Sequence, residues 1–197
     1  FTNEIAPVTV ITKQGQIEVG IDESPGSAMP EKIAHLKPAF HPQGTITAAN
    51  SSSISDGAAA LMLMTESKAR TLNLVPLAVV VGHASMAIAP DAFTVAPIYA
   101  LEALLEKIQW QIQDVDLFEI NEAFAMVTMA CSTQLNIPPE KVNVHGGACA
   151  LGHPIGASGA RILVTLVHAL RLHGKSKGIA CLCIGGGEAV AVAIEVG

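Results

Sequence analysis

The sequence contains few cysteines, few aromatic rings and few charges, and each shortage excludes a class of protein. Its four cysteines, Cys131, Cys149, Cys181 and Cys183, are too few and too unevenly spaced for a disulfide-bonded framework. Aromatic residues make up 4% of the 197 residues, and charged residues make up 14%. Because 50% of the residues are apolar, the chain is not intrinsically disordered. Its aliphatic, glycine-rich composition indicates an α/β enzyme rather than an all-β sandwich.

Basic residues are also scarce, which bears on partners and location. The 11 lysines and arginines are scattered and the net charge is −6, so we expect no nucleic-acid partner. No apolar run approaches the roughly 18 residues of a membrane-spanning helix, and no secretory signal pattern is visible. We therefore expect free thiols, no membrane partner and a cytoplasmic protein.

The first part of the chain, to about residue 50, is irregular and contains five of the 11 prolines. Two short strands are predicted at Val8–Ile11 and Gln16–Val19, and a short helix is predicted at Glu31–Leu36. Because the sequence opens at Phe1 without an element of its own, we expect the N-terminal part of a longer protein to be missing.

The remaining residues predict an α/β architecture. A polar cluster at residues 50–57 precedes the apolar run AAALMLM, which predicts a capped, buried helix continuing to about Thr71. From about Leu74 the order is βαβαβα followed by two strands, which predicts a mixed sheet with helices on both faces. The predicted strands are Leu77–Gly82, Val115–Ile120, Val142–Val144, Ile179–Ile184 and Ala189–Val196, and the predicted helices begin at Pro97, Glu122 and Pro154, with Gly174 closing the last.

Three glycine-rich or polar clusters follow predicted strands, where α/β folds place their sites. They lie at residues 121–125, 145–159 and 181–187. Glycine clusters alone indicate turns or tight packing. The second cluster is not a phosphate loop, because it lacks Gly-Lys-Ser/Thr, and it is not a dinucleotide fingerprint, because the Gly-x-Gly-x-x-Gly spacing is absent.

Several interpretations of these clusters stay open. A metal site built from His145, His153, Cys181 and Cys183 has poor spacing for zinc, Cys183 fits an ordinary core thiol, and His153 fits a turn cap. Alternatively, a histidine, a cysteine and an asparagine on neighbouring loops converge on one carbonyl, where the histidine lowers the pKa of a thiol. Backbone N–H groups of a glycine run hold a developing oxyanion, so the set suits acyl transfer or carbon–carbon chemistry beside a thioester.

Three ordered motifs resemble the C-terminal signatures of the thiolase family, and most of all those of its acetyl-CoA acetyltransferases. They are NEAFA at residues 121–125, GGA followed by LGHPIGASG within residues 146–159, and CIGGG at residues 183–187. Residues 45–50 and 56–60 also resemble the end of the family's loop domain. The resemblance therefore covers essentially the whole chain.

The resemblance implies the C-terminal half of a thiolase fold, with residues 1–54 ending the loop domain, 55–74 forming the last helix of the N-terminal core domain and 75–197 forming the C-terminal domain. It implies a reversible Claisen condensation of two acetyl-CoA to acetoacetyl-CoA and CoA, in lipid metabolism, by a homo-oligomer (a dimer or tetramer) without a cofactor. The family's nucleophilic cysteine belongs to the missing half, so we expect the chain alone to be inactive. A 3-ketoacyl-CoA thiolase of fatty-acid β-oxidation and a non-catalytic acyl-CoA-binding relative remain alternatives.

The resemblance also implies catalytic roles. His153 matches the histidine that activates the nucleophile, and Cys183 matches the second cysteine, which exchanges the α-proton of the acetyl group. Asn121 matches the asparagine that positions a water, and that water and His153 form one oxyanion hole. The N–H of Gly185 matches half of the second hole.

Two further residues match the family's substrate-binding positions. Ser52 matches the serine that contacts the pantetheine arm of CoA, and Phe124 matches an apolar wall of the site. The sequence departs from the pattern at His145, where asparagine is frequent, and at Ser53, where glycine is frequent; the second departure weakens the assignment of Ser52.

Overall fold

The computed structural model describes all 197 residues and contains a four-stranded sheet, a separate two-stranded hairpin and six α-helices. In chain order the elements are β1 Val8–Thr12, β2 Gly15–Val19, α1 Pro30–Ile33, α2 Glu66–Thr71, β3 Val79–Ala87, α3 Ala96–Ile108, β4 Leu117–Ile120, α4 Ala125–Leu135, α5 Ala148–Leu151, α6 Ser158–Leu172, β5 Lys177–Ile184 and β6 Glu188–Glu195. None of these helices combines the length and the apolar composition that crossing a membrane requires.

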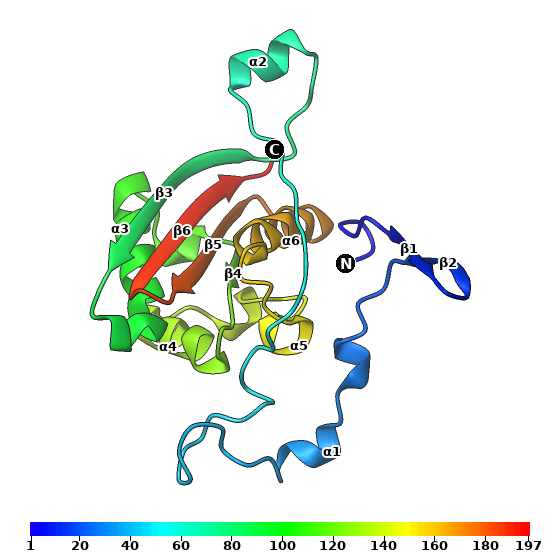
Figure 1. Cartoon of the computed structure of the whole chain (residues 1–197). Coiled ribbons are helices and arrows are strands. Elements are labelled where there is room, and N and C mark those ends of the chain that lie inside the picture. The colour runs from blue at the N-terminus through cyan, green and yellow to red at the C-terminus, as the bar shows by residue number, and fades with distance from the viewer.

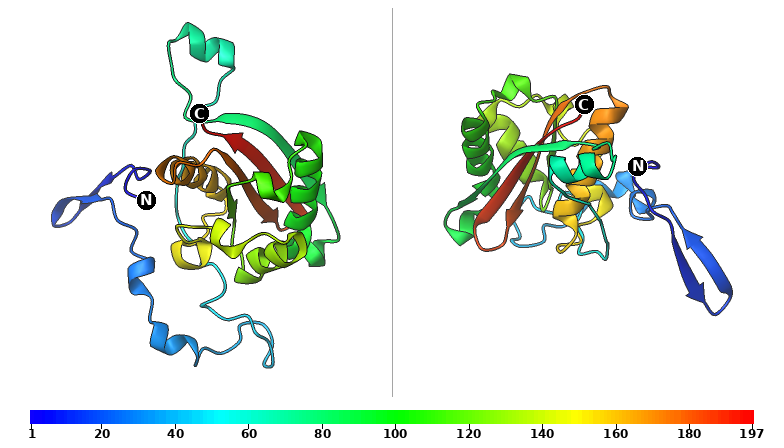
Figure 2. Two further views of the ribbon diagram at one scale, coloured as in Figure 1. Left: turned by 180° about the vertical axis from the view of Figure 1, so that it is seen from behind. Right: turned by 90° about the horizontal axis from the view of Figure 1, so that it is seen from above.

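The sheet confirms the predicted mixed α/β class. Its strand order is β3-β6-β5-β4, with β4 parallel to β5 and the other neighbours antiparallel. Helices α3 and α4 cover one face and α6 covers the other, as Figures 1 and 2 show. The crossover from β4 to the parallel β5 contains α4, α5 and α6. It leaves the sheet at the carboxyl end of β4, the edge that carries the candidate site, and returns at the amino end of β5.

Apolar side chains at helical spacing build the core on both faces. On α3, Leu101 and Leu104 are fully buried against Phe118 of β4 in a cluster of 18 buried residues. On the opposite face, α6 packs closely because Gly178 has no side chain: a Cβ there would lie 2.7 Å from a methyl carbon of Leu166. The two layers hold β4 and β5 rigidly from both sides.

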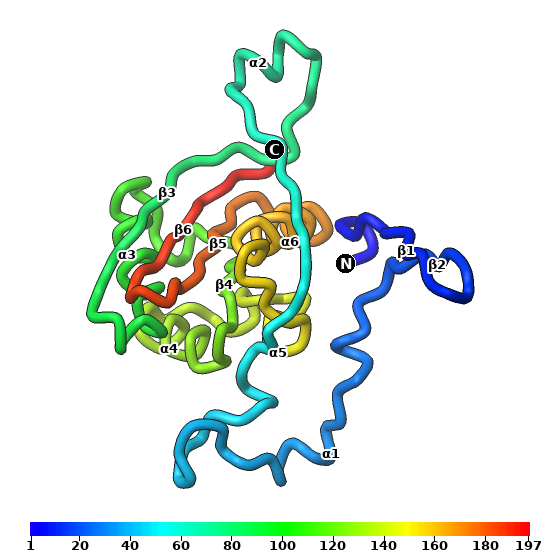
Figure 3. Tube along the Cα trace, in the orientation of Figure 1, coloured from blue at the N-terminus to red at the C-terminus, as the bar shows by residue number.

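The predicted helix through residues 58–65 is wrong. Residues 57–64 are extended, no backbone hydrogen bond involves them, and the helix α2 spans only Glu66–Thr71. Met62 is 84% exposed, so the run is not buried as predicted. An apolar helix takes most of its stability from packing against other elements, and most residues of this run are exposed. Figure 3 shows the segment in cyan; its backbone runs past α6 to α2 without forming a helix or a strand.

Two strand predictions also need correction. The strand predicted as buried at Leu77–Gly82 is β3, which runs from Val79 to Ala87 at the edge of the sheet with mostly exposed residues. No strand forms at Val142–Val144, where Val142 makes only a single parallel bridge to Phe118. Asn143 has a φ of +47°, which turns the chain out of the extended conformation immediately after that bridge.

Two helices begin later in the sequence than predicted, so the residues before each of them form loops. Helix α4 begins at Ala125 rather than Glu122, and α6 begins at Ser158 rather than Pro154. The intervening residues form the loops that carry the predicted site residues. The two strands predicted near the N-terminus are confirmed as β1 and β2, which form a hairpin with its turn at Lys13 and Gln14. The hairpin projects away from the sheet (Figure 2).

The core predicts a strong contrast between two leucines. Leu104→Ala leaves a cavity beneath α3, so we expect the free energy of unfolding to fall by about 3 kcal/mol. Leu172→Ala, at a position 67% exposed near the end of α6, should change it by less than about 0.5 kcal/mol. Urea denaturation of both variants measures the difference. Equal losses would contradict the assignment of the core.

Candidate active site

The first predicted site residue, Asn121, immediately follows β4 and is held by the neighbouring strand. Its backbone N–H donates to the carbonyl of Cys181 in β5 at 2.9 Å. The register pairs Ile120 with Cys181, so Cys183 lies two residues further toward the same strand end. Because carboxyl ends of parallel strands meet at one edge of a sheet, Asn121 and Cys183 share that edge.

The segment around Ser52 runs along the loop that follows β4. The backbone N–H and the hydroxyl of Ser52 both donate to the carbonyl of Ala123, at 3.1 and 3.0 Å. Ser51 forms a β-bridge with Phe124, and the backbone N–H of His153 donates to the carbonyl of Ser53 at 2.9 Å. The structure therefore brings Ser52, Asn121, Phe124 and His153 together, although they lie in three separate parts of the sequence.

The imidazole of His153 is oriented from both ring nitrogens. Nδ1 lies 2.5 Å from the hydroxyl of Ser158, and Nε2 lies 3.4 Å from the side-chain nitrogen of Asn121. The Ser158 hydroxyl donates to the carbonyl of Pro154 at 3.0 Å, so it accepts from Nδ1–H. Nε2 then has no proton and accepts from the Asn121 amide. This tautomer presents His153 as a base.

Burial shapes the electrostatics of this pair. Burial disfavours the charged imidazolium and the positive charge of Arg161 adds to the effect, so the pKa of His153 is lowered. Asn121 is 1% exposed, and its Oδ1 has no hydrogen-bond partner in the protein. A buried acceptor without a partner costs free energy, and a ligand that donates a hydrogen bond there offsets that cost.

Cys183 and Gly185 occupy the end of β5 and the turn that follows it. Cys183 is 6% exposed, and burial raises the pKa of its thiol. Gly185 lies in the exposed turn between β5 and β6, where a Cβ would meet nothing within 4 Å. The turn closes at Gly187, whose φ is +94° and whose carbonyl accepts from the backbone N–H of Ile88 at 2.9 Å. No metal site forms from the histidines and cysteines, because no three His, Cys, Asp or Glu side chains gather in a suitable arrangement.

Sequence reasoning missed three polar residues behind the site. Ser158 lies five residues after His153 in the second glycine-rich cluster, so its place in the sequence could have indicated it. Glu119 and Arg161 lie behind Asn121, with Oε2 and Nη1 3.5 Å apart. Burial raises the pKa of Glu119 to about 8, although the Arg161 guanidinium opposes that rise. A charged residue inside an apolar strand, two residues before Asn121, was the available signal.

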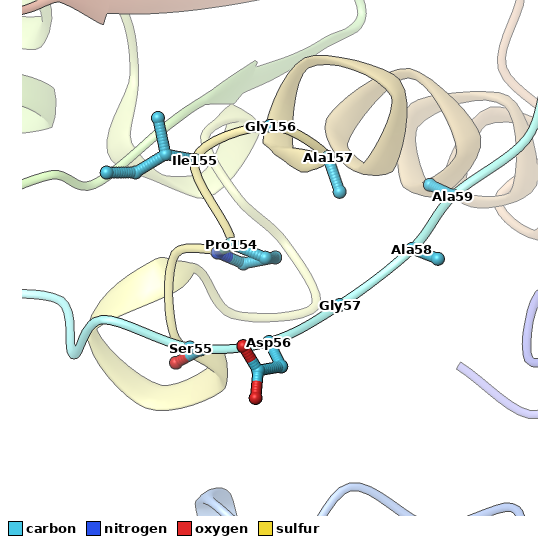
Figure 4. A pocket seen from close by; sticks show the side chains of 9 residues that line it. All are labelled: Ser55, Asp56, Gly57, Ala58, Ala59, Pro154, Ile155, Gly156 and Ala157. Carbon is cyan, nitrogen blue, oxygen red and sulfur yellow. The ribbon is translucent and has the colours of Figure 1, made fainter.

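A cavity of about 400 Å³ lies beside this site and is separate from the predicted residues. Figure 4 shows that residues 55–59 form one wall and residues 154–157 the other. None of the six predicted site residues lines it. The cavity thus lies between the extended segment and the start of α6. The predicted site residues lie outside it.

Two family models match the sequence, one after the other along the chain. The pattern of the thiolase N-terminal domain matches residues 1–67, and the pattern of the thiolase C-terminal domain matches residues 74–196. A probable acetyl-CoA acyltransferase of Staphylococcus aureus is 47% identical over 197 residues, and the cytosolic acetyl-CoA acetyltransferase of the rat is 48% identical over 201 aligned residues. These alignments cover 99% and 100% of this chain, but 50% of each relative.

Solved structures agree with these matches. The acetyl-CoA acetyltransferase of Bacillus anthracis superposes with a TM-score of 0.95 at 45% identity, covering 98% of this chain and 50% of that one. Human mitochondrial 3-ketoacyl-CoA thiolase superposes with a TM-score of 0.90 at 37% identity, covering 98% and 49%. A thiolase of Ascaris suum in complex with coenzyme A gives a TM-score of 0.88 at 42% identity, covering 98% and 49%.

The fold and the polar strand-end site define a mixed α/β protein in which a hydrogen-bonded histidine lies beside a buried asparagine amide. The chain belongs to the thiolase family, as the C-terminal-domain match over residues 74–196 shows. It spans about half the length of the curated relatives that it matches.

The electrostatics of His153 predict a measurable titration. Because burial and Arg161 lower its pKa, the imidazole should titrate below 6.5 and stay neutral into mildly acid solution. The folded state therefore disfavours protonation, and stability from this group should fall as the pH decreases through 6.5 toward the lowered value.

Arg161→Gln removes one of the two causes, so we expect it to move the midpoint upward. Arg171→Gln, at an exposed position on the same helix, is the matched control and should leave the midpoint unchanged. The ring resonances of His153, followed by NMR against pH, supply the measurement. A midpoint at or above 6.5 in the unmodified chain would show that the site is not desolvated as described.

Proposed function

We propose that this chain is the C-terminal half of an acetyl-CoA C-acetyltransferase, which interconverts two acetyl-CoA with acetoacetyl-CoA and CoA. The names of the Staphylococcus aureus, rat and Bacillus anthracis relatives support this activity. The observation that carries the proposal is the placement of the Asn121 amide against Nε2 of His153, with Nδ1 fixed by Ser158. A neutral, oriented imidazole beside a buried amide is suited to acyl transfer.

His153 acts as the base in the first half of the reaction. Nε2 accepts the thiol proton of the nucleophilic cysteine, which the family places in the half outside this chain. The thiolate attacks the carbonyl of acetyl-CoA, and the CoA thiolate leaves with the proton of the Cys183 thiol, so that CoA departs as its thiol and Cys183 is left as a thiolate. Once protonated, Nε2–H donates to a thioester oxygen, and a water on the free Oδ1 of Asn121 donates beside it.

Cys183 removes or returns the α-proton of the second acetyl-CoA. In the condensation its thiolate, formed when CoA left, removes the α-proton. The resulting carbanion attacks the acetylated cysteine, whose thiolate leaves and regains its proton from Nε2–H of His153, which releases acetoacetyl-CoA. The reverse direction, thiolysis, returns that proton from the Cys183 thiol. The raised pKa suits both steps, because a thiolate of high basicity is needed to remove a weakly acidic α-proton. The N–H of Gly185 contributes to the second oxyanion hole.

Ser52 and Phe124 are proposed to bind the substrate next to this chemistry. Their backbones lie along the loop after β4, so a pantetheine arm that contacts Ser52 leads toward Asn121 and His153. The Ascaris suum thiolase, whose structure contains coenzyme A, supports a CoA thioester as ligand. The proposed reaction requires no metal or prosthetic group, because fixed dipoles polarise both carbonyls.

The remaining proposals concern location and assembly. The cytosolic rat relative supports a cytoplasmic enzyme. A homo-oligomer and a place in lipid metabolism follow from the same family membership. The division into residues 1–54, 55–74 and 75–197 stays a prediction.

A second candidate activity is thiolysis of longer 3-ketoacyl-CoA, which the similarity to human mitochondrial 3-ketoacyl-CoA thiolase favours. The two are distinguished by kcat/KM for acetoacetyl-CoA and for 3-ketohexadecanoyl-CoA, measured on a complete thiolase that contains these 197 residues. The proposed function predicts a preference for acetoacetyl-CoA. A preference for the long substrate would assign the chain to fatty-acid degradation instead.

The catalytic roles predict large losses in that complete enzyme. We expect His153→Ala and Cys183→Ala each to reduce kcat for thiolysis by roughly 1,000-fold, the range of general acid–base catalysis. His83→Ala, at an exposed position, is the matched control and should retain turnover. Full activity of Cys183→Ala would remove it as the base. If CoA binds but the unmodified enzyme does not turn over, the chain belongs to a non-catalytic relative.

A further inference from the structure

We infer that Glu122 and Asn143 are positioning residues, which together set the distance between Asn121 and His153. The inference deepens the proposed function, because that distance matters only if the two side chains act on one substrate. Neither Glu122 nor Asn143 belongs to the six residues to which the resemblance assigns a role.

Asn143 extends the pairing of β4 by one residue through its side chain. The backbone N–H of Ile120 donates to Oδ1 of Asn143 at 2.8 Å, and Nδ2 of Asn143 donates to the carbonyl of Ile120, also at 2.8 Å. The backbone N–H of Asn143 donates to the carbonyl of Phe118 at 2.9 Å. Its φ of +47° turns the side chain back toward the strand. Asn143 therefore fixes the backbone immediately before Asn121.

Glu122 joins that strand end to the loop before His153. Its Oε1 accepts from Nδ2 of Asn143, and its Oε2 accepts from the backbone N–H of Cys149, each at 3.0 Å. The loop approaches closely because residue 147 is glycine: a Cβ there would lie 2.4 Å from the carboxyl carbon of Glu122. Both carboxylate oxygens thus face donors, one from each side.

This arrangement connects the two reacting side chains by a short path. Glu122 is covalently adjacent to Asn121, while Cys149 belongs to α5, which ends at Leu151 and is capped by Gly152 immediately before His153. The backbone N–H of Gly152 donates to the carbonyl of Ala148 at 2.8 Å, which keeps that turn closed. A change at Glu122 therefore shifts Nε2 of His153 relative to Nδ2 of Asn121.

Glutamine cannot replace Glu122, although it has the same shape. An amide has one accepting oxygen, so its NH₂ group would face either the Cys149 N–H or Nδ2 of Asn143. Asn143 cannot turn its amide to compensate, because Ile120 uses both ends of that amide. Glu122→Gln therefore breaks one of the two contacts and leaves the fold otherwise unchanged.

The first test follows the geometry directly, in the 197-residue chain. In Glu122→Gln we expect the Cys149 amide proton to move upfield, as a hydrogen bond to a carboxylate is lost, and the Asn121 side-chain amide and His153 ring resonances to shift with it. Glu102→Gln, at an exposed position on α3, removes the same charge and should move none of them. If Glu122→Gln lowers only the unfolding temperature and leaves Asn121 and His153 unmoved, its role is structural and the inference is wrong.

The second test measures catalysis in the complete thiolase. A displacement of the base by about 1 Å costs on the order of 100-fold in rate, so Glu122→Gln should lower kcat by about that factor while KM for CoA stays within about twofold. Unchanged kcat would overturn the inference and leave the proposed function standing. Absence of thiolysis in the unmodified enzyme would refute the proposed function, and the NMR comparison would still decide the positioning role.

Asn143→Gly tests the same contact from the other side. Glycine adopts the left-handed backbone conformation without strain, so only the side chain is lost. We expect the same shifts at Asn121 and His153 as in Glu122→Gln. Because one contact joins the two side chains directly, the double variant should lose less than the sum of the two single variants. Fully additive losses would show that Glu122 and Asn143 act independently.

Discussion

The hydrogen bonds at the carboxyl end of β4 hold together the groups that the proposed chemistry uses. The N–H of Asn121 pairs with Cys181 of β5, and the Asn143 side chain pairs with Ile120. Ser52 pairs with the carbonyl of Ala123, two residues further on. Each contact joins segments far apart in the sequence, so the site exists only when the sheet and both helix layers have formed. The four residues of β4 are buried along the whole strand because core clusters cover both faces of the sheet.

The hydrogen bonds of His153 determine its tautomer, and the tautomer determines whether Nε2 can accept a proton. Ser158 begins α6 and has two acceptors beside its single hydroxyl proton, the Pro154 carbonyl and the ring nitrogen. Since a carbonyl can only accept, the proton order along Pro154, Ser158 and His153 is determined, and Nε2 is left free to accept. A base is therefore prepared by hydrogen bonding on the side of the ring that faces away from the substrate.

The sequence predicted the parts of the fold that depend on periodicity. Helix α3, strand β5 and the N-terminal hairpin agree with their predictions because spacing and turn residues specify them locally. The helix predicted over residues 58–64 does not form. The alanines, leucines and methionines of this run favour a helix, but whether an apolar helix is stable depends on the surface against which it packs. At the site, the motifs indicated Asn121 and His153, but the contacts through Ser158, Glu122 and Asn143 depend on side-chain directions that no spacing rule supplies.

The exposed apolar run and the exposed edge strand β3 fit a chain that spans half the length of its relatives. Large apolar areas on a protein surface mark places where another surface belongs. The central claim, however, concerns the sheet edge, and a crystal structure of the complete thiolase with acetyl-CoA tests it most directly. The account predicts the thioester oxygen within hydrogen-bond distance of Nε2 of His153, and the acetyl methyl carbon against Sγ of Cys183. A thioester bound elsewhere, with His153 and Cys183 facing different cavities, would contradict it.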